Sequence, residues 1–240
     1  MARRRPTKNI KEVRPTIIGA GITEQWYFTH LQSLFGLKIK IRPRYFGHET
    51  MNLLAKRIEQ VLSEEGKAVV VFDTDVTTWD DMEKKRFEQL KKKYAKNGNV
   101  VICDSMPSIE FWFLLHYVDT SRSFPTSKSV ITQLVKYITN FDKTDSFLRN
   151  KKWVESMSSD GKLRKAYERA KASVTREGSY SNVWKAIEEI GLMPSLYFFF
   201  VSRWLSYCQY GSSREGNAEI TTPSLRSLHT PGCLKIVTLM

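Results

Sequence analysis

The first 120 residues alternate short β-rich runs with helical patterns, and this alternation limits the possible folds more than any other feature. Four runs are typical of strands: Pro15–Gly19, Lys38–Phe46, Ala68–Asp73 and Asn99–Cys103. The third is continuously apolar, as expected of a strand that is buried on both faces. Because a helical pattern separates each pair of strands, right-handed crossovers are expected. The sequence therefore predicts an α/β fold with a mostly parallel sheet flanked by helices.

After Pro107 the pattern becomes helical throughout, and Pro107 suits the start of a helix because the missing N–H has no partner there. The expected helices are Thr23–Phe35, Thr50–Glu65, Trp79–Lys96, Ser108–Tyr117, Ser127–Asn140, Gly161–Ser173 and Ser181–Ile190. Three regions follow from this change. We predict an α/β core over residues 1–120, a helical extension with a basic surface over 121–190, and an apolar run followed by a loose tail over 191–240.

The charge balance is strongly basic, with 38 Lys and Arg against 25 Asp and Glu, a net charge of +13. Much of the excess lies in residues 1–15 and 149–176. Such a balance favours a polyanionic partner, and nucleic acid is the first expectation. The residues expected to contact phosphates are Lys162, Arg164, Lys165 and Lys171. The alternative is that basic termini and solvated helix faces only aid solubility.

Signals for secretion or membrane insertion are weak. The three cysteines form neither a CxxC pair nor an even framework, which suits a reducing compartment. The charged N-terminus is not followed by an apolar segment of the secretory type. The apolar run Leu192–Val201 is about half as long as a membrane span requires. We therefore expect a cytoplasmic protein without a membrane partner.

Acidic residues follow three of the four predicted strands. Glu24 follows the first strand, Asp73 and Asp75 follow the third, and Glu110 follows the fourth. In an open α/β sheet the functional crevice lies outside the carboxyl ends of the strands, so these acids are expected to converge there. Oxygen ligands without a thiolate or a histidine pair favour Mg²⁺ or Mn²⁺. For Asp73 and Asp75 alone, an acidic turn that caps the next helix is the alternative.

Glu110 is the more informative acid, because it interrupts the apolar segment Ile109–Leu115 in the first turn of a helix. A carboxylate among aromatic side chains is costly unless it is exposed or paired with a cation. The alternative is that Glu110 and Glu24 only interact favourably with the N-terminal ends of their helices. The combination of acids at three strand ends favours a shared site.

Three sequence blocks also carry a family resemblance. IIGAGITEQWYFTHL, VVVFDTDV and SMPSIEFWFLLHY resemble, in order and spacing over residues 14–120, the signatures of RloB-like TOPRIM (topoisomerase-primase) proteins. The resemblance implies a TOPRIM fold and, by likeness to nucleases of the overcoming-lysogeny-defect class, phosphodiester hydrolysis with two metal ions.

By that likeness, Asp73 and Asp75 would hold one cation, and Glu24, Ser108 and Glu110 would help to hold the second. Lys143 lies where the family tends to carry a lysine, which would stabilise transition-state charge. An exposed lysine at a helix end is its alternative.

One departure from the family pattern affects the expected activity. Ala20 stands where the family signature GEG has its glutamate, whether by natural divergence or by an introduced substitution. The resemblance then implies an effector nuclease of bacterial phage defence that binds RNA, including tRNA, or DNA, but cuts poorly. An ATPase partner is implied by analogy, and a homodimer is left open. The alternative is a non-catalytic nucleic-acid-binding or regulatory module.

Overall fold

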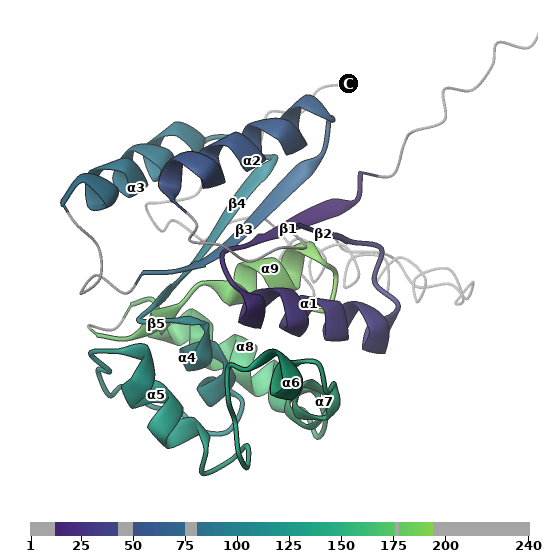
Figure 1. The fold of residues 1–240 in the computed structure, drawn as a ribbon, viewed down its shortest axis with the longest axis vertical. Coiled ribbons are helices and arrows are strands. Elements are labelled where there is room, and N and C mark those ends of the chain that lie inside the picture. Colours follow the sequence, from purple (N-terminus) through teal and green to yellow (C-terminus); the bar gives the residue numbers. More distant parts are fainter. Residues whose placement is uncertain (1–12, 43–49, 75–80, 176–177, 194–240) are drawn as a thin grey trace, which may run out of the picture. The chain divides into compact units, whose positions relative to one another are not determined.

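A five-stranded sheet lies at the centre of the structure, a computed structural model that describes residues 13–42, 50–74, 81–175 and 178–193 (Figure 1). The strands are β1 (Pro15–Gly19), β2 (Lys40–Arg42), β3 (Lys67–Asp73), β4 (Val100–Met106) and β5 (Tyr180–Ser181). Their order in the sheet is β2-β1-β3-β4-β5. The first four are parallel, and β5 pairs antiparallel with the end of β4. The predicted mostly parallel α/β fold is confirmed.

Helices cover both faces of the sheet. They are α1 (Ile22–Phe35), α2 (Met51–Ser63), α3 (Asp81–Tyr94), α4 (Ile109–Leu115), α5 (Ser127–Leu134), α6 (Asp145–Leu148), α7 (Lys152–Ser158), α8 (Lys162–Ser173) and α9 (Val183–Glu189). Figure 1 shows α2 and α3 side by side on one face, and α1, α4, α8 and α9 on the other. We call these the α2–α3 face and the α1–α4 face.

Side-chain alternation along the central strands supplies a core to both faces. In β3, Val69 and Val71 pack on the α1–α4 face, whereas Val70 and Phe72 pack on the α2–α3 face. All four are at most 1% exposed. This is why the run is continuously apolar, and burial of each side chain contributes about 1.5–3 kcal/mol.

Local signals set the ends of several helices where the sequence predicts them. The Thr50 side chain accepts a hydrogen bond from Leu53 N at 3.3 Å and caps α2. Gly36 adopts a left-handed conformation with φ of 63° and ends α1. Thr126 and Ser129 form a capping box at the start of α5.

The region after α4 differs from the prediction of continuous helix. Helix α5 ends at Leu134 instead of Asn140, because the following turns use i−3 hydrogen bonds such as Tyr137 N to Leu134 O. The short helices α6 and α7 and the strand β5 were not predicted, since elements of two to seven residues carry little periodicity. Part of the predicted strand Lys38–Phe46 lies outside the described residues.

The helices after α4 share a core with the first half of the chain. Leu163, Ala166 and Ile187 belong to the same buried cluster as Phe28 of α1 and Trp112 of α4. Strand β5 extends the sheet beside β4. In the described part of the chain, no helix is long and apolar enough to cross a membrane.

Candidate active site

Three of the four predicted acids meet at the carboxyl ends of the parallel strands. Glu24 lies in the first turn of α1, Asp73 is the last residue of β3, and Glu110 lies in the first turn of α4. Glu24 is 3% exposed and Glu110 is fully buried. The three carboxylates are close enough for their charges to act on one another. The fourth acid, Asp75, lies outside the described residues.

Two glycines make room for Glu24, whose side chain folds back over the start of its own helix. A Cβ atom at Gly21 would lie 2.8 Å from Glu24 Oε2, and one at Gly19 would lie 3.0 Å from Glu24 Cβ. Burial raises the pKa of Glu24 to about 7, the Glu110 charge adds to the rise, and backbone N–H groups offset part of it. The Gly-x-Gly sequence therefore serves the placement of this carboxylate.

Asp73 joins the sheet to α4. Its Oδ1 accepts a hydrogen bond from Ile109 N at 2.7 Å, so the strand caps a helix that begins 36 residues later. Ser108, the local N-cap residue, makes no such bond. Burial, followed by the charges of Glu24 and Glu110, holds the pKa of Asp73 well above its ordinary range. These carboxylates therefore repel one another unless a cation or a proton is present.

A lysine brings a positive charge to the acids. Lys143 Nζ lies 2.9 Å from Glu110 Oε1. Burial lowers the pKa of Lys143, but Glu110, Asp73 and Glu24 together raise it above its ordinary value. Beyond this ion pair, neither Glu110 oxygen has a hydrogen-bond partner among the described residues, and neither does the buried Ser108 Oγ. Buried oxygens without partners are costly, so a further ligand would stabilise them.

The chemistry of these oxygens suits a hard divalent cation. Ser108 Oγ has no hydrogen-bond partner and Glu110 has only its ion pair with Lys143, and Glu24 and Asp73 add two more carboxylates whose charges act on this place. Among the described residues, however, no three His, Cys, Asp or Glu side chains are arranged so that they hold a metal ion by themselves. A metal centre here would need a ligand beyond these residues, and Asp75 is the predicted one.

Ala20 lies at the end of β1, where its N–H donates to Val71 O at 3.1 Å. Its methyl group packs on the α2–α3 face. Asp73 and Glu110, by contrast, contact elements of the α1–α4 face. A longer side chain at position 20 would therefore have to reach over the end of the strand to join the other acids.

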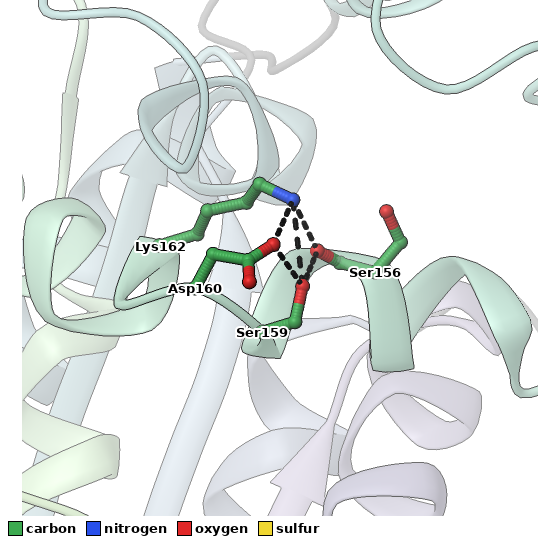
Figure 2. A network of polar contacts seen from close by, with 4 residues as sticks. All are labelled: Ser156, Ser159, Asp160 and Lys162. Atoms are coloured by element: carbon green, nitrogen blue, oxygen red, sulfur yellow. Dashed lines mark hydrogen bonds and ion pairs between the residues drawn. The ribbon is translucent and has the colours of Figure 1, made fainter.

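The four residues predicted to contact nucleic acid fall into two groups. In the first group, Lys162 and Lys171, the ammonium groups already bind other residues of the protein. Lys162 Nζ bonds to Ser156 O at 3.0 Å and lies 3.4 Å from Ser159 Oγ and from Asp160 Oδ2 (Figure 2). Lys171 Nζ lies 3.3 Å from Glu188 Oε1 and 4.7 Å from the centre of the Trp184 ring. Both ammonium groups hold helices together.

Arg164 and Lys165 form the second group. Both side chains are exposed on α8, and neither forms an ion pair with another described residue. Their charges are therefore free to meet a phosphate.

One polar network near the site could not be predicted from the sequence. Asp104 is 4% exposed and accepts hydrogen bonds from Tyr180 OH at 2.9 Å and from Asn182 Nδ2 at 2.7 Å. The partners follow 76 and 78 residues later in the chain. The only sequence signal was an acid at the end of a buried strand, which does not reveal its partners.

The fold and site define an α/β protein with an acidic cluster at the carboxyl edge of its sheet. The model of the RloB-like protein family matches residues 16–190, most of the described structure. The chain belongs to the RloB-like family. A search of the curated proteins and a search of the solved structures each returned no match.

Proposed function

We propose that the acid cluster is the active site of a TOPRIM-type nuclease that depends on divalent cations, and that Ala20 impairs its cleavage. The observation that carries the proposal is the meeting of Glu24, Asp73 and Glu110 from three separate elements in a buried place. Three buried carboxylates beside a single lysine are unfavourable in a site that serves packing alone. Clustered acids with raised pKa values, as at Glu24 and Asp73, are typical of functional sites.

Mg²⁺ or Mn²⁺ would be held by Asp73 and Asp75 and by Glu24, Ser108 and Glu110. When bound, such cations activate a water molecule and stabilise the leaving oxygen of a phosphodiester. The donor set supports this assignment, because Ser108 Oγ has no hydrogen-bond partner and the buried Glu110 carboxylate has only its ion pair with Lys143. The Glu24 carboxylate is oriented by the space that the two glycines leave.

Lys143 would stabilise negative charge in this site. Its ammonium group is ion-paired with Glu110 and lies within the electrostatic reach of Asp73 and Glu24. With a side chain 40% exposed, it also faces the solvent from which a phosphodiester would approach. A cation at this place favours the transition state of phosphodiester cleavage, in which charge builds up on the phosphoryl oxygens.

The substrate would be RNA, including tRNA, or DNA, and the activity would serve defence against phage together with an ATPase. The net charge of +13 and the exposed Arg164 and Lys165 support a nucleic-acid substrate. Membership of the RloB-like family supports the same class of protein. The defence role and the ATPase rest on analogy with related systems.

A second candidate function is a non-catalytic nucleic-acid-binding module. Ala20 favours it, because a methyl group supplies no ligand and packs on the α2–α3 face. In that case the acids would regulate folding or partner binding instead of cleavage.

Restoring the family glutamate at position 20 distinguishes a nuclease from a non-catalytic binding module. With Mn²⁺ or Mg²⁺, Ala20→Glu should cleave RNA or DNA about 10³-fold faster than the native chain, which corresponds to about 4 kcal/mol of transition-state stabilisation. Ala20→Gln is the matched control, because it has nearly the same size without a carboxylate. Ala20→Glu combined with Asp73→Asn should be inactive.

The experiment needs a cellular arm, because the substrate is a class and not a single molecule. Nucleic-acid integrity and growth are measured after induction of each variant, with and without the candidate ATPase and phage. If Ala20→Glu leaves RNA and DNA intact in every setting, the nuclease proposal fails and the binding module takes its place.

A further inference from the structure

A cavity of about 680 Å³ lies along the outer edge of β4, between α3 and α9. None of the three acids of the candidate active site lines it. Val100, Val101 and Ile102 form an apolar wall. In the described part of the chain, β5 pairs only with Ser105 and Met106 of β4, so this stretch of the strand has no neighbour on that side.

Asn182 lines one end of the cavity, and its side chain contains a buried hydrogen-bond acceptor without a donor. The Asn182 side chain donates through Nδ2 to Asp104 Oδ1, and because a carboxylate only accepts, this bond fixes the orientation of the amide. Oδ1 of Asn182 therefore points elsewhere, and it has no partner although the residue is only 7% exposed. An acceptor so placed favours a ligand that brings an N–H donor.

The rim of the cavity is positively charged. Lys91, Lys92 and Lys185 line it together with a single exposed acid, Glu88. Lys91 lies 3.9 Å from Glu88, which leaves Lys92 and Lys185 as the ammonium groups without a carboxylate partner among the described residues. The rim therefore favours an anionic group.

We propose that this cavity binds a nucleoside monophosphate whose base carries an exocyclic amine. The amine donates to Asn182 Oδ1, the flat base lies against the apolar wall of β4, and the phosphate contacts Lys92 and Lys185. The volume falls within the range of small-molecule sites, about 300–1,000 Å³. This site is separate from the acid cluster, and the inference does not depend on the proposed nuclease activity.

Calorimetric titration of the full native chain tests the base specificity, with a chelator present so that no metal-dependent reaction interferes. The probes are AMP, GMP and CMP, with IMP as the counterpart of the two purines and UMP as that of CMP. At least one amine-bearing nucleotide should bind about tenfold more tightly than its counterpart, the effect of one hydrogen bond to a buried acceptor. Equal binding of the members of each pair, or no binding at about 1 mM, would overturn the proposal.

Charge reversal on the rim tests the location. Lys92→Glu should weaken binding of the same nucleotide about tenfold or more, and the nucleoside without its phosphate should bind as weakly. Lys96→Glu is the matched control, since it makes the same change of charge on an exposed residue outside the cavity. If both variants weaken binding equally, the phosphate senses only the overall charge, and the assigned site is wrong.

Discussion

The two faces of the sheet are covered by cores that differ in size and composition. The α2–α3 face is covered by a small cluster in which Leu54, Ile58 and Val70 are fully packed. In the described part of the chain, neither α2 nor α3 buries a carboxylate or a histidine. The α1–α4 face has a much larger core, rich in aromatic rings, and it also buries Glu24 and Glu110.

This difference shows where a fold can carry unfavourable groups. A buried charge costs free energy that the surrounding packing must offset. On the α1–α4 face, Phe113 contacts the rings of Tyr27 and Trp153 with centroids 5.0 and 5.2 Å apart, close to the first turn of α4. The aromatic core therefore supports the same helix that buries Glu110. Mutations on the two faces should show how much each core contributes to the free energy of unfolding.

The largest expected effect is the loss of an aromatic ring from the α1–α4 face. Phe113→Ala should lower the free energy of unfolding by about 4 kcal/mol, because the ring is fully buried among other rings. Phe87→Ala on the α2–α3 face is the matched control. Its ring is 7% exposed at the edge of the smaller cluster, so a loss at the low end of the usual range, about 3 kcal/mol, is expected. Equal losses in urea unfolding would remove the distinction between the faces.

The next effect concerns a buried base on the α1–α4 face. Burial lowers the pKa of His116 from 6.5 to about 4, although the hydrogen bond to Trp112 O opposes the shift. Below pH 6.5 the unfolded chain takes up a proton that the folded chain does not, so stability falls as the pH drops from 6.5 to 4.

His116→Phe should remove this dependence. The difference in unfolding free energy between the variant and the native chain should change by up to about 3 kcal/mol across that pH interval. Denaturant unfolding at several pH values measures it. A constant difference would mean that His116 does not take part in acid destabilisation.

A divalent cation should produce a smaller change. At about ten times its dissociation constant, Mg²⁺ or Mn²⁺ should add about 1.4 kcal/mol to the stability of Ala20→Glu. Asp73→Asn in the same background should abolish the gain, because it removes a proposed ligand. Thermal melting with and without the ion is the measurement. A melting temperature that stays constant in both the native chain and Ala20→Glu would argue against a metal centre.

The last prediction concerns the exposed surface of α8 on the same face, where substitutions should hardly change stability but should change nucleic-acid binding. Replacing Arg164 and Lys165 by Ala should flatten the salt dependence of nucleic-acid binding by about two units of log–log slope. Lys162→Ala should leave that slope unchanged, because its ammonium group is already bound to Ser156 and Ser159. The reverse pattern would place the binding surface on the residues that hold the helices together.

Much of the α/β core was predictable because its signals are local. The continuous apolar run predicted β3, and acids at strand ends predicted the meeting of Glu24, Asp73 and Glu110, since parallel strands end at one edge. A strand of two residues such as β5 has no alternation to detect, and it owes its place to pairing with β4.

Contacts between residues that lie far apart in the sequence could not be predicted from it. Lys143 was predicted to stabilise transition-state charge, but its ion pair with Glu110 depends on the path of the chain after α5. Nothing in the spacing distinguishes Lys162 and Lys171, which hold helices together, from Arg164 and Lys165, which do not. The network around Asp104 likewise depends on partners that follow it by 76 and 78 residues.

The glycines of the chain will not be equivalent in a saturation mutagenesis scan. Gly36 has a φ of 63° with open space around it, so the backbone is what restricts it, and Asn is its best replacement. At Gly21 the backbone is extended and accepts any residue, but an added Cβ would lie 2.8 Å from the Glu24 carboxylate. Ala there should leave abundance and folding unchanged while displacing one carboxylate. Position 21 would then be neutral in a selection for folded protein and intolerant in a selection for activity of the Ala20→Glu form.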